Sequence, residues 1–198
     1  QRKGIRRAVV ISGGFKERGE EGKALEEKLK AVAAEHGIRF VGPNCIGVIN
    51  SKNNLNFTFF PYTLGPGPMG LLSQSGTYVT QVLPHLKNRG MRYSKAVSLG
   101  NEADIDIVDG LEYLGEDPDT KAIALYIEAV RRGREFFETA RRVSMKKPIV
   151  AYYVGGTGAG ARSGMSHTGA MGGDDAVHDG MFRQCGIVRA PTVERLYD

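Results

Sequence analysis

The sequence predicts an α/β protein with a parallel sheet, and three observations support this fold class. Short apolar runs alternate with stretches of helical periodicity along most of the 198 residues. The runs are short and continuously apolar, which is typical of buried parallel strands. Most of them end in glycine or polar turns, such as residues 12–14, 73–77 and 100–102. We therefore expect strands that alternate with helices, with turns at their carboxyl ends.

The first part of the chain is expected to form a strand, a helix and a second strand. Residues 8–11 are the first strand, followed by a glycine turn at residues 12–14. A helix should run from about residue 20 to residue 36, where Gly37 ends it. Residues 38–41 are the next strand and residues 42–45 the turn after it. The expected apolar face of the helix consists of Leu25, Leu29, Val32 and Ala33.

The segment at residues 50–67 is expected to be a linker between two α/β units. It has no helical period and is rich in asparagine, proline and glycine. We place the boundary near Gly65, which gives one unit at residues 1–64 and another at residues 65–198.

The second unit shows the most regular alternation of strand and helix. Strands are expected at residues 69–72, 94–99, 121–127, 148–154 and 187–188. Helices are expected at residues 78–88, 105–115, 134–144 and 175–185, and Thr192 should cap a further helix. Five strands alternating with helices predict a doubly wound parallel sheet of the flavodoxin-like kind.

Composition excludes several classes of protein. Hydrophobic residues make up 41% and charged residues 25%, as in ordinary globular domains. The net charge is 27 − 22 = +5, and because the cationic residues are scattered we expect no nucleic-acid partner. No apolar run approaches the ~20 residues of a membrane helix. Cys45 and Cys185 are too few for a disulfide framework or a metal site, so we expect a cytoplasmic protein. Because the chain begins with Gln1 just before a strand, we expect it to be a fragment of a longer protein.

Polar features follow several of the expected strands. In an open parallel sheet the functional site lies beyond the carboxyl ends of the strands. Four such features are found there: the turn at residues 73–77, the turn Gly100 and Asn101, Glu128, and the glycine-rich loop with His167. The topology should bring them to one rim of the sheet.

His167 is the candidate nucleophile and would carry a phosphoryl group. It lies among small residues, after an expected strand and before an expected helix, so one ring nitrogen could face a substrate. The alternative is an ordinary surface histidine beside a flexible hinge. Glu128 could accept the proton of one imidazole nitrogen and leave the other nucleophilic, or it could be a plain solvated glutamate.

Ser75, Gly76 and Thr77 are the candidate phosphate-binding residues. They open a helix, where free backbone N–H groups and the helix dipole favour an anion. The alternative is a plain helix cap. The glycine run at residues 155–160 lacks the Gly-Lys-Ser/Thr ending of a nucleotide-binding P-loop. Its glycines suit a mobile loop better, and Arg162 could offer positive charge to a phosphate.

Several motifs together resemble the ADP-forming acyl-CoA synthetases, relatives of succinyl-CoA synthetase. The segments that carry the resemblance lie at residues 70–76, 97–104, 116–123, 160–162 and 166–170, in the order and spacing of that family. The match covers nearly all of the chain.

The resemblance implies a different role for each of the two units. Residues 65–198 correspond to the phosphohistidine domain of the α-type portion, with His167 as the phosphorylated residue, Glu128 as its partner and Ser75, Gly76 and Thr77 as the phosphate site. Residues 1–64 resemble the end of a Rossmann-like CoA-binding domain. The implied CoA-binding residues are Ser12, Gly13, Gly14, Phe15, Pro43, Asn44 and Cys45.

The implied reaction converts acyl-CoA, ADP and phosphate into the free acid, CoA and ATP, and runs in both directions. Coenzyme A is the implied cofactor, while ATP or ADP with magnesium would bind an ATP-grasp domain or β-type subunit outside this chain. The resemblance also implies an oligomeric enzyme, and this chain alone should not turn over. A regulatory CoA-sensing module, as fused to some lysine acetyltransferases, and an interaction domain without a small ligand are the alternatives. The presence of both His167 and Glu128 favours the ligase.

Overall fold

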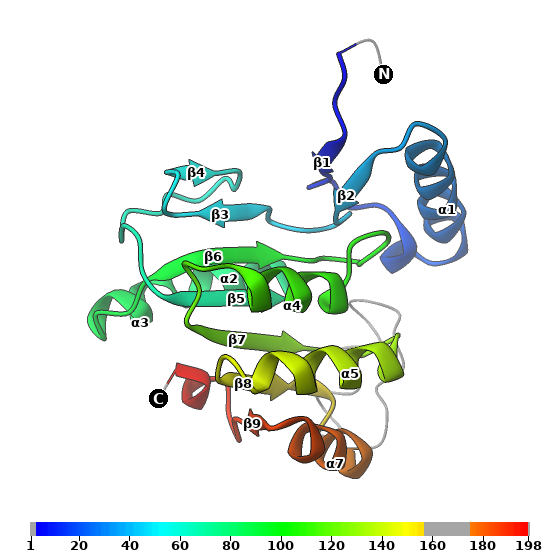
Figure 1. The fold of residues 1–198 in the computed structure, drawn as a ribbon. Coiled ribbons are helices and arrows are strands. Elements are labelled where there is room, and N and C mark those ends of the chain that lie inside the picture. The colour runs from blue at the N-terminus through cyan, green and yellow to red at the C-terminus, as the bar shows by residue number, and fades with distance from the viewer. Residues whose placement is uncertain (1–2, 157–174, 198) are drawn as a thin grey trace.

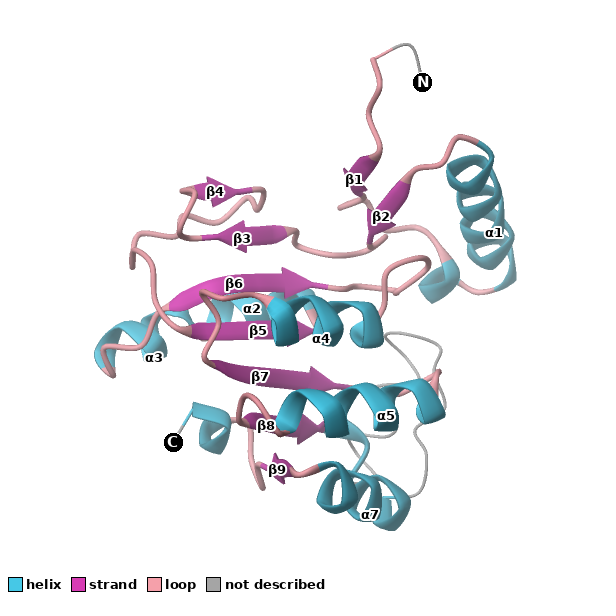
Figure 2. Ribbon diagram, in the orientation of Figure 1, coloured by secondary structure: helices cyan, strands magenta, loops and turns pink. Residues whose placement is uncertain are grey.

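A computed structural model describes residues 3–156 and 175–197 of the chain. It contains a two-stranded sheet and a seven-stranded sheet, with helices packed against them. The small sheet with its helix lies beyond one edge of the larger sheet, next to the strand tips (Figure 1). Figure 2 shows the same arrangement coloured by secondary structure. The α/β fold class predicted from the sequence is confirmed.

The small sheet pairs two parallel strands, β1 (Arg7–Val9) and β2 (Arg39–Val41). The 3₁₀ turn η1 (Lys16–Arg18) and helix α1 (Glu20–Glu35) connect them. The apolar face expected for α1 is wrong in part, because Leu25 and Val32 are 49% and 46% exposed. Instead, Glu26 is buried, since its carboxylate accepts a 2.8 Å hydrogen bond from the side chain of Asn101. A polar contact with the larger unit therefore sets the orientation of this helix.

The larger sheet has the strand order β4-β3-β6-β5-β7-β8-β9. Five of its strands are parallel to one another: β5 (Met69–Ser73), β6 (Tyr93–Ser98), β7 (Ala122–Ile127), β8 (Ile149–Tyr153) and β9 (Ile187–Arg189). Their order, with the first strand between the second and the third, is the flavodoxin-like order. The predicted doubly wound sheet is thus present.

Two antiparallel strands extend this sheet beyond the prediction. They are β3 (Val48–Asn50) and β4 (Leu55–Asn56), and β3 pairs with β6 through Ile49 opposite Ala96. The expected linker at residues 50–67 therefore contains part of an edge hairpin. Residues 48–56 were assigned to the first unit, but they belong to the larger sheet. Strands of two or three residues are too short to show a hydrophobic period. Burial of Ile49, which is 2% exposed, fixes the pairing.

Helices cover both faces of the larger sheet (Figure 1). Three helices pack on the face toward the viewer: α4 (Ile107–Glu116), α5 (Gly133–Ser144) and α7 (Asp175–Cys185). The other face carries α2 (Gly76–Gln81), α3 (Leu83–Asn88) and the 3₁₀ turn η3 (Glu194–Tyr197). The helix expected at residues 78–88 is broken at Val82, because Pro84 has no N–H with which to continue the helix. The further helix expected after Thr192 is this short 3₁₀ turn.

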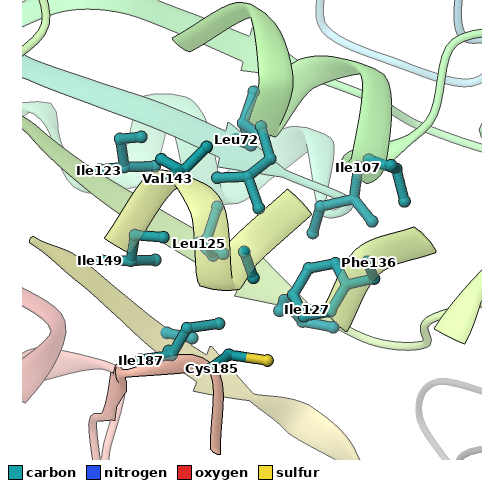
Figure 3. Packing of buried hydrophobic residues seen from close by; sticks show 14 of the residues in the cluster. Leu72, Ile107, Ile123, Leu125, Ile127, Phe136, Val143, Ile149, Cys185 and Ile187 are labelled. Carbon is teal, nitrogen blue, oxygen red and sulfur yellow. The ribbon is translucent and has the colours of Figure 1, made fainter. Parts of the chain in front are cut away.

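The main hydrophobic core lies between the sheet and α4, α5 and α7. Figure 3 shows strand residues such as Leu72, Leu125 and Ile149 facing the helix residues Phe136 and Val143. All five are at most 4% exposed. This packing fixes the strand ends at one rim. None of the helices in the described ranges combines the length and the apolar character that a membrane span requires.

Candidate functional site

A pocket of about 450 Å³ lies at the rim formed by the carboxyl ends of β5 and β7. This is the switch point of the flavodoxin-like strand order, where ligands bind in such folds. Residues predicted from the sequence contribute part of its lining: Asn44, Cys45, Ser75, Gly76, Thr77, Gly100, Asn101 and Glu128. Residues that are far apart in the sequence therefore meet at one pocket.

Ser75, Gly76 and Thr77 form the turn from β5 into α2. Helix α2 starts at Gly76, and the hydroxyl of Ser75 makes no capping hydrogen bond to it. Ser75 occupies the N-cap position, but its side chain does not cap the helix, contrary to the helix-cap alternative. The Ser75 and Thr77 hydroxyls lie 3.4 Å apart beside the pocket. A Cβ on Gly76 would lie 3.1 Å from the Ile46 side chain, so the turn packs closely on residues 44–46.

Gln74 holds the end of β7 in position. Its side-chain oxygen accepts the backbone N–H groups of Glu128 at 2.5 Å and Ala129 at 3.0 Å. Its side-chain nitrogen donates to the carbonyl of Ala129 at 2.7 Å and to the carboxylate of Glu102 at 2.8 Å. All four hydrogen-bonding positions of this buried amide are therefore satisfied. The sequence motif included Gln74, but its role was not predicted.

Glu128 follows β7 directly, lies half-buried and lines the pocket together with Tyr126. Burial, and next the negative charge of Glu128, raises the pKa of Tyr126 to about 12. Tyr126 therefore stays a neutral phenol near neutral pH, and it can donate a hydrogen bond. The structure places Glu128 on the same pocket as the turn at Ser75, as the sequence predicted.

The turn at Gly100, Asn101 and Glu102 joins the two units. The Asn101 side chain is fully buried and donates to the carboxylates of Glu17 at 2.6 Å and Glu26 at 2.8 Å. Burial raises the pKa of Glu102 to about 7. Because this carboxyl also accepts the N–H of Ile107 at 2.9 Å, it ties the turn to the start of α4.

Only some of the predicted CoA-binding residues line the pocket. Asn44 and Cys45 do so, whereas Pro43 lies just behind them and accepts the N–H of Asn101 at 2.8 Å. Burial raises the pKa of Cys45 to about 11, so its thiol is neutral and is a poor nucleophile. The Cys45 side chain serves as part of the pocket wall.

The loop that holds Ser12, Gly13, Gly14 and Phe15 lies behind Asn44 and outside the pocket lining. The carbonyl of Ser12 accepts the N–H of Asn44 at 2.9 Å, and a Cβ on Gly13 would lie 3.3 Å from the Asn44 side chain. The N–H groups of Gly14 and Phe15 both donate to the carboxylate of Glu17, at 2.5 and 3.0 Å. This loop supports the pocket through Asn44.

His167 lies outside the residues that the structure describes, as do Arg162 and most of the glycine-rich run. The strand before it, β8, ends at Tyr153, and the next residue, Val154, lines the pocket. The pocket residues that sequence reasoning missed are apolar or aromatic: Ile11, Ile46, Phe59, Phe60, Tyr126 and Val154. No polar motif marked them. Among the described residues, no cluster of histidine, cysteine or acidic side chains could hold a metal ion.

Known proteins are similar to this chain in sequence and fold. The model for the succinyl-CoA ligase like flavodoxin domain matches residues 66–198. An ADP-forming acetate–CoA ligase from Archaeoglobus fulgidus is 44% identical over 100% of the chain, which spans 29% of that relative. The α subunit of an ADP-forming acetate–CoA ligase from Pyrococcus furiosus is 42% identical over 99% of the chain, which spans 42% of the subunit.

The structural comparison agrees with the sequence comparison. An acetyl-coenzyme A synthetase from Candidatus Korarchaeum cryptofilum, solved with phosphate and ADP, has a TM-score of 0.91 and 39% identity. The alignment covers 98% of this chain and 42% of the other. The chain thus spans less than half the length of these relatives. The domain match over residues 66–198 shows that the chain belongs to the family of succinyl-CoA ligase like flavodoxin domains, and its strand order agrees with this.

Proposed function

We propose that this chain is the part of an ADP-forming acyl-CoA synthetase that contacts CoA and carries the phosphohistidine. The whole enzyme would interconvert acyl-CoA, ADP and phosphate with the free acid, CoA and ATP. Residues 1–64 would complete a CoA-binding domain, and residues 65–198 would form the phosphohistidine domain. The observation that carries the proposal is the single pocket shared by the Ser75 turn, Glu128 and Asn44 with Cys45.

In the proposed reaction the turn at Ser75, Gly76 and Thr77 binds phosphate. Backbone N–H groups at the start of a helix favour an anion, and the two hydroxyls beside the pocket add donors. A phosphate oxygen attacks the thioester carbonyl, the carbon–sulfur bond breaks, and CoA leaves as the thiolate. The product is an acyl phosphate held at the same rim.

The next two steps move the phosphoryl group. A ring nitrogen of His167 attacks phosphorus, the bond to the acyl oxygen breaks, and the free carboxylate leaves. The phosphohistidine then transfers its phosphoryl group to ADP. Glu128 accepts the N–H of the other ring nitrogen, which holds the tautomer and stabilises the positive charge of the modified ring.

The proposed CoA-binding residues lie in this chain, whereas the nucleotide would bind another part of the enzyme. Asn44 and Cys45 line the pocket where the CoA thiol would enter, and Ser12, Gly13, Gly14, Phe15 and Pro43 support that wall. ATP or ADP with magnesium would bind an ATP-grasp domain or β-type subunit. The subunit name of the Pyrococcus furiosus relative fits such a partner.

Phosphate labelling of the full-length protein tests this proposal. We expect wild-type protein incubated with γ-labelled ATP and magnesium to gain acid-labile, base-stable phosphate. His167→Asn should abolish the label, and Glu128→Gln should lower the labelling rate about 10²-fold or more, as for other groups that support proton transfer. His36→Asn, at the end of α1, is the matched histidine control and should label normally. A wild-type protein that binds acyl-CoA but never labels would refute the ligase and favour the sensing module.

A further inference from the structure

Glu102 is a buried acid that the proposed phosphate relay does not use. It lies in the turn between β6 and α4, is 6% exposed, and is not part of the pocket lining. Acidic side chains are almost never this deeply buried unless they have specific partners. The partners of Glu102 therefore indicate what it does.

The backbone of Glu102 is held in a left-handed conformation. Its φ is 54°, a region that residues other than glycine rarely adopt. The Arg131 guanidinium supports this turn, since it donates to the carbonyls of Asn101 at 2.6 Å and Glu102 at 3.0 Å. Backbone strain that the surrounding structure maintains is found most often at functional sites. The turn thus combines a strained backbone with a buried acid, directly after the pocket residues Gly100 and Asn101.

The carboxylate of Glu102 is separated from Glu128 by a single side chain. One of its oxygens accepts the side-chain N–H of Gln74 at 2.8 Å, and the other accepts the backbone N–H of Ile107 at 2.9 Å. The oxygen of the same Gln74 amide accepts the backbone N–H of Glu128 at 2.5 Å. Because both carboxylate oxygens of Glu102 serve as acceptors, the ionised form suits these contacts best.

Burial and charged neighbours set the protonation of Glu102. Burial raises its pKa to about 7, and the negative charge of Asp106 acts in the same direction. The hydrogen bond from Gln74 and the positive charge of Arg131 oppose this rise. Lys16, from the turn after β1, also interacts with the Glu102 charge. The carboxyl is therefore ionised above about pH 7 and neutral below it.

We infer that Glu102 is a positioning residue, whose carboxylate orients the Gln74 amide and, through it, the backbone that presents Glu128 to the pocket. The inference rests on the proposed function, because it concerns how the same site is prepared for phosphoryl transfer to His167. The Gln74 oxygen faces Glu128 only while the Gln74 nitrogen faces its acceptors, because the two ends of one amide turn together. When Glu102 takes up a proton, its hydrogen bond from Gln74 loses the assistance of the charge and weakens, so Glu128 is held less firmly.

The rate of histidine phosphorylation in the full-length enzyme tests the inference. Wild type and Glu102→Gln are mixed with γ-labelled ATP and magnesium, and the initial labelling rate is measured at about pH 6 and about pH 8, on either side of the pKa. Glu102→Gln should label about 10-fold or more slower than wild type at the higher pH, because a displaced supporting group misplaces Glu128. At the lower pH, Glu102 of wild type is itself protonated, so the ratio of the two rates should fall toward one.

A purely structural role of Glu102 would give a rate ratio that does not change with pH. Such a constant ratio would overturn the inference. So would a wild-type labelling rate that fails to rise between the two pH values, and this second result does not depend on the folding of any variant.

Glu112→Gln is the matched control. Glu112 is an acid on the same helix that Glu102 precedes, but its side chain is 53% exposed and pairs with Arg142 at 2.8 Å. This variant should label at the wild-type rate at both pH values. An equal loss in Glu112→Gln and Glu102→Gln would show that the effect does not come from the contacts of Glu102 and would refute its positioning role.

A double variant tests the route through Gln74. Gln74→Leu removes the amide that joins Glu102 to Glu128. Adding Glu102→Gln to Gln74→Leu should slow labelling no further, because residues that act through one another give non-additive losses. Losses that multiply would mean that Glu102 acts by another route, contrary to the inference.

Hydrogen exchange separates this inference from the proposed reaction, because it needs no turnover. The backbone N–H groups of residues 128 and 129 should exchange about 10-fold faster in Glu102→Gln than in wild type at the same pH, since Gln74 holds both of them. If no histidine is labelled but this exchange is faster, the proposed function fails and the positioning role stands. If labelling is normal and neither the rate ratio nor the exchange depends on Glu102, the reaction stands and the positioning role is wrong.

Discussion

At the residue scale, Gln74 determines where Glu128 lies. One buried amide bonds the N–H groups of Glu128 and Ala129, the carbonyl of Ala129 and the carboxylate of Glu102. The amide is needed because its oxygen faces two donors while its nitrogen faces two acceptors. A carboxylate or a hydrocarbon of similar size satisfies at most one of these two demands.

Gln74→Leu should therefore lower the free energy of unfolding by about 2–4 kcal/mol, since it leaves buried donors and acceptors without partners. Urea unfolding of the 198-residue chain measures this loss. Gln81→Leu is the matched control on an exposed position of α2 and should change the value by roughly 0.5 kcal/mol or less. Equal stability of Gln74→Leu and wild type would show that the amide does not hold the strand end.

The sequence predicted the location of this site but not its supporting contacts. The rule that ligands bind at the carboxyl ends of parallel strands was enough to group Ser75 and Glu128. The role of Gln74 depends on partners 28 and 54 residues away, and no local pattern reports such contacts. Phe59 and Phe60 were not predicted to line the pocket, because the composition of residues 50–67 indicated a linker.

At the element scale, side-chain hydrogen bonds cap the N-terminus of α4. Asp106 caps it by accepting the N–H groups of Val108 at 2.9 Å and Asp109 at 3.2 Å, and the Asp109 carboxylate accepts the N–H of Asp106 in return. The Arg132 guanidinium donates to the Asp106 carboxylate, at 2.6 Å through Nε. This pair links the start of α4 to the start of α5.

Asp106→Ala should cost about 1–3 kcal/mol of unfolding free energy, because it removes a helix cap and the partner of Arg132. Asp106→Asn keeps an acceptor for the cap but not the charge, so its loss should be smaller. Thermal unfolding monitored by circular dichroism compares the three proteins. If the alanine variant melts with wild type, the cap does not contribute to stability.

Strongly periodic elements were predicted best and short ones worst. Helices α4, α5 and α7 lie within a residue or two of their expected positions, because ten or more residues of pattern define them. The strands of the hairpin, β3 and β4, are too short to show a periodic pattern in the sequence. Only the structure shows the hairpin, through the pairing of β3 with β6. The prediction of which face of α1 is buried was wrong in part, because a long-range hydrogen bond to Glu26 outweighs a weak apolar pattern.

At the scale of the whole molecule, the two units meet along one continuous line of contacts. The N–H groups of Asn101, Ala103 and Ile105 donate to the carbonyls of Pro43, Gly42 and Phe40, at 2.8, 3.0 and 3.2 Å. Gly100 makes this approach possible. It has a φ of 60°, and a Cβ there would lie 2.2 Å from the Pro43 carbonyl oxygen.

Gly100→Ala should therefore destabilise the chain by about 2–4 kcal/mol, through both left-handed backbone strain and a clash with backbone atoms. Gly90→Ala is the matched control. Gly90 has a φ of 67°, but nothing lies within 4 Å of its would-be Cβ, so only the strain of about 1 kcal/mol should remain. Equal losses in the two variants, measured by urea unfolding, would show that the close approach at Gly100 carries no energy.

The edge hairpin of β3 and β4 affects how the protein can be divided for study. A truncated protein that starts at residue 65 would strip these strands from β6 and leave its backbone N–H and C=O groups unpaired. Such a bare edge invites strand addition from another molecule and leads to self-association. The smallest well-behaved piece should therefore begin before Val48, even though the matched domain begins at residue 66.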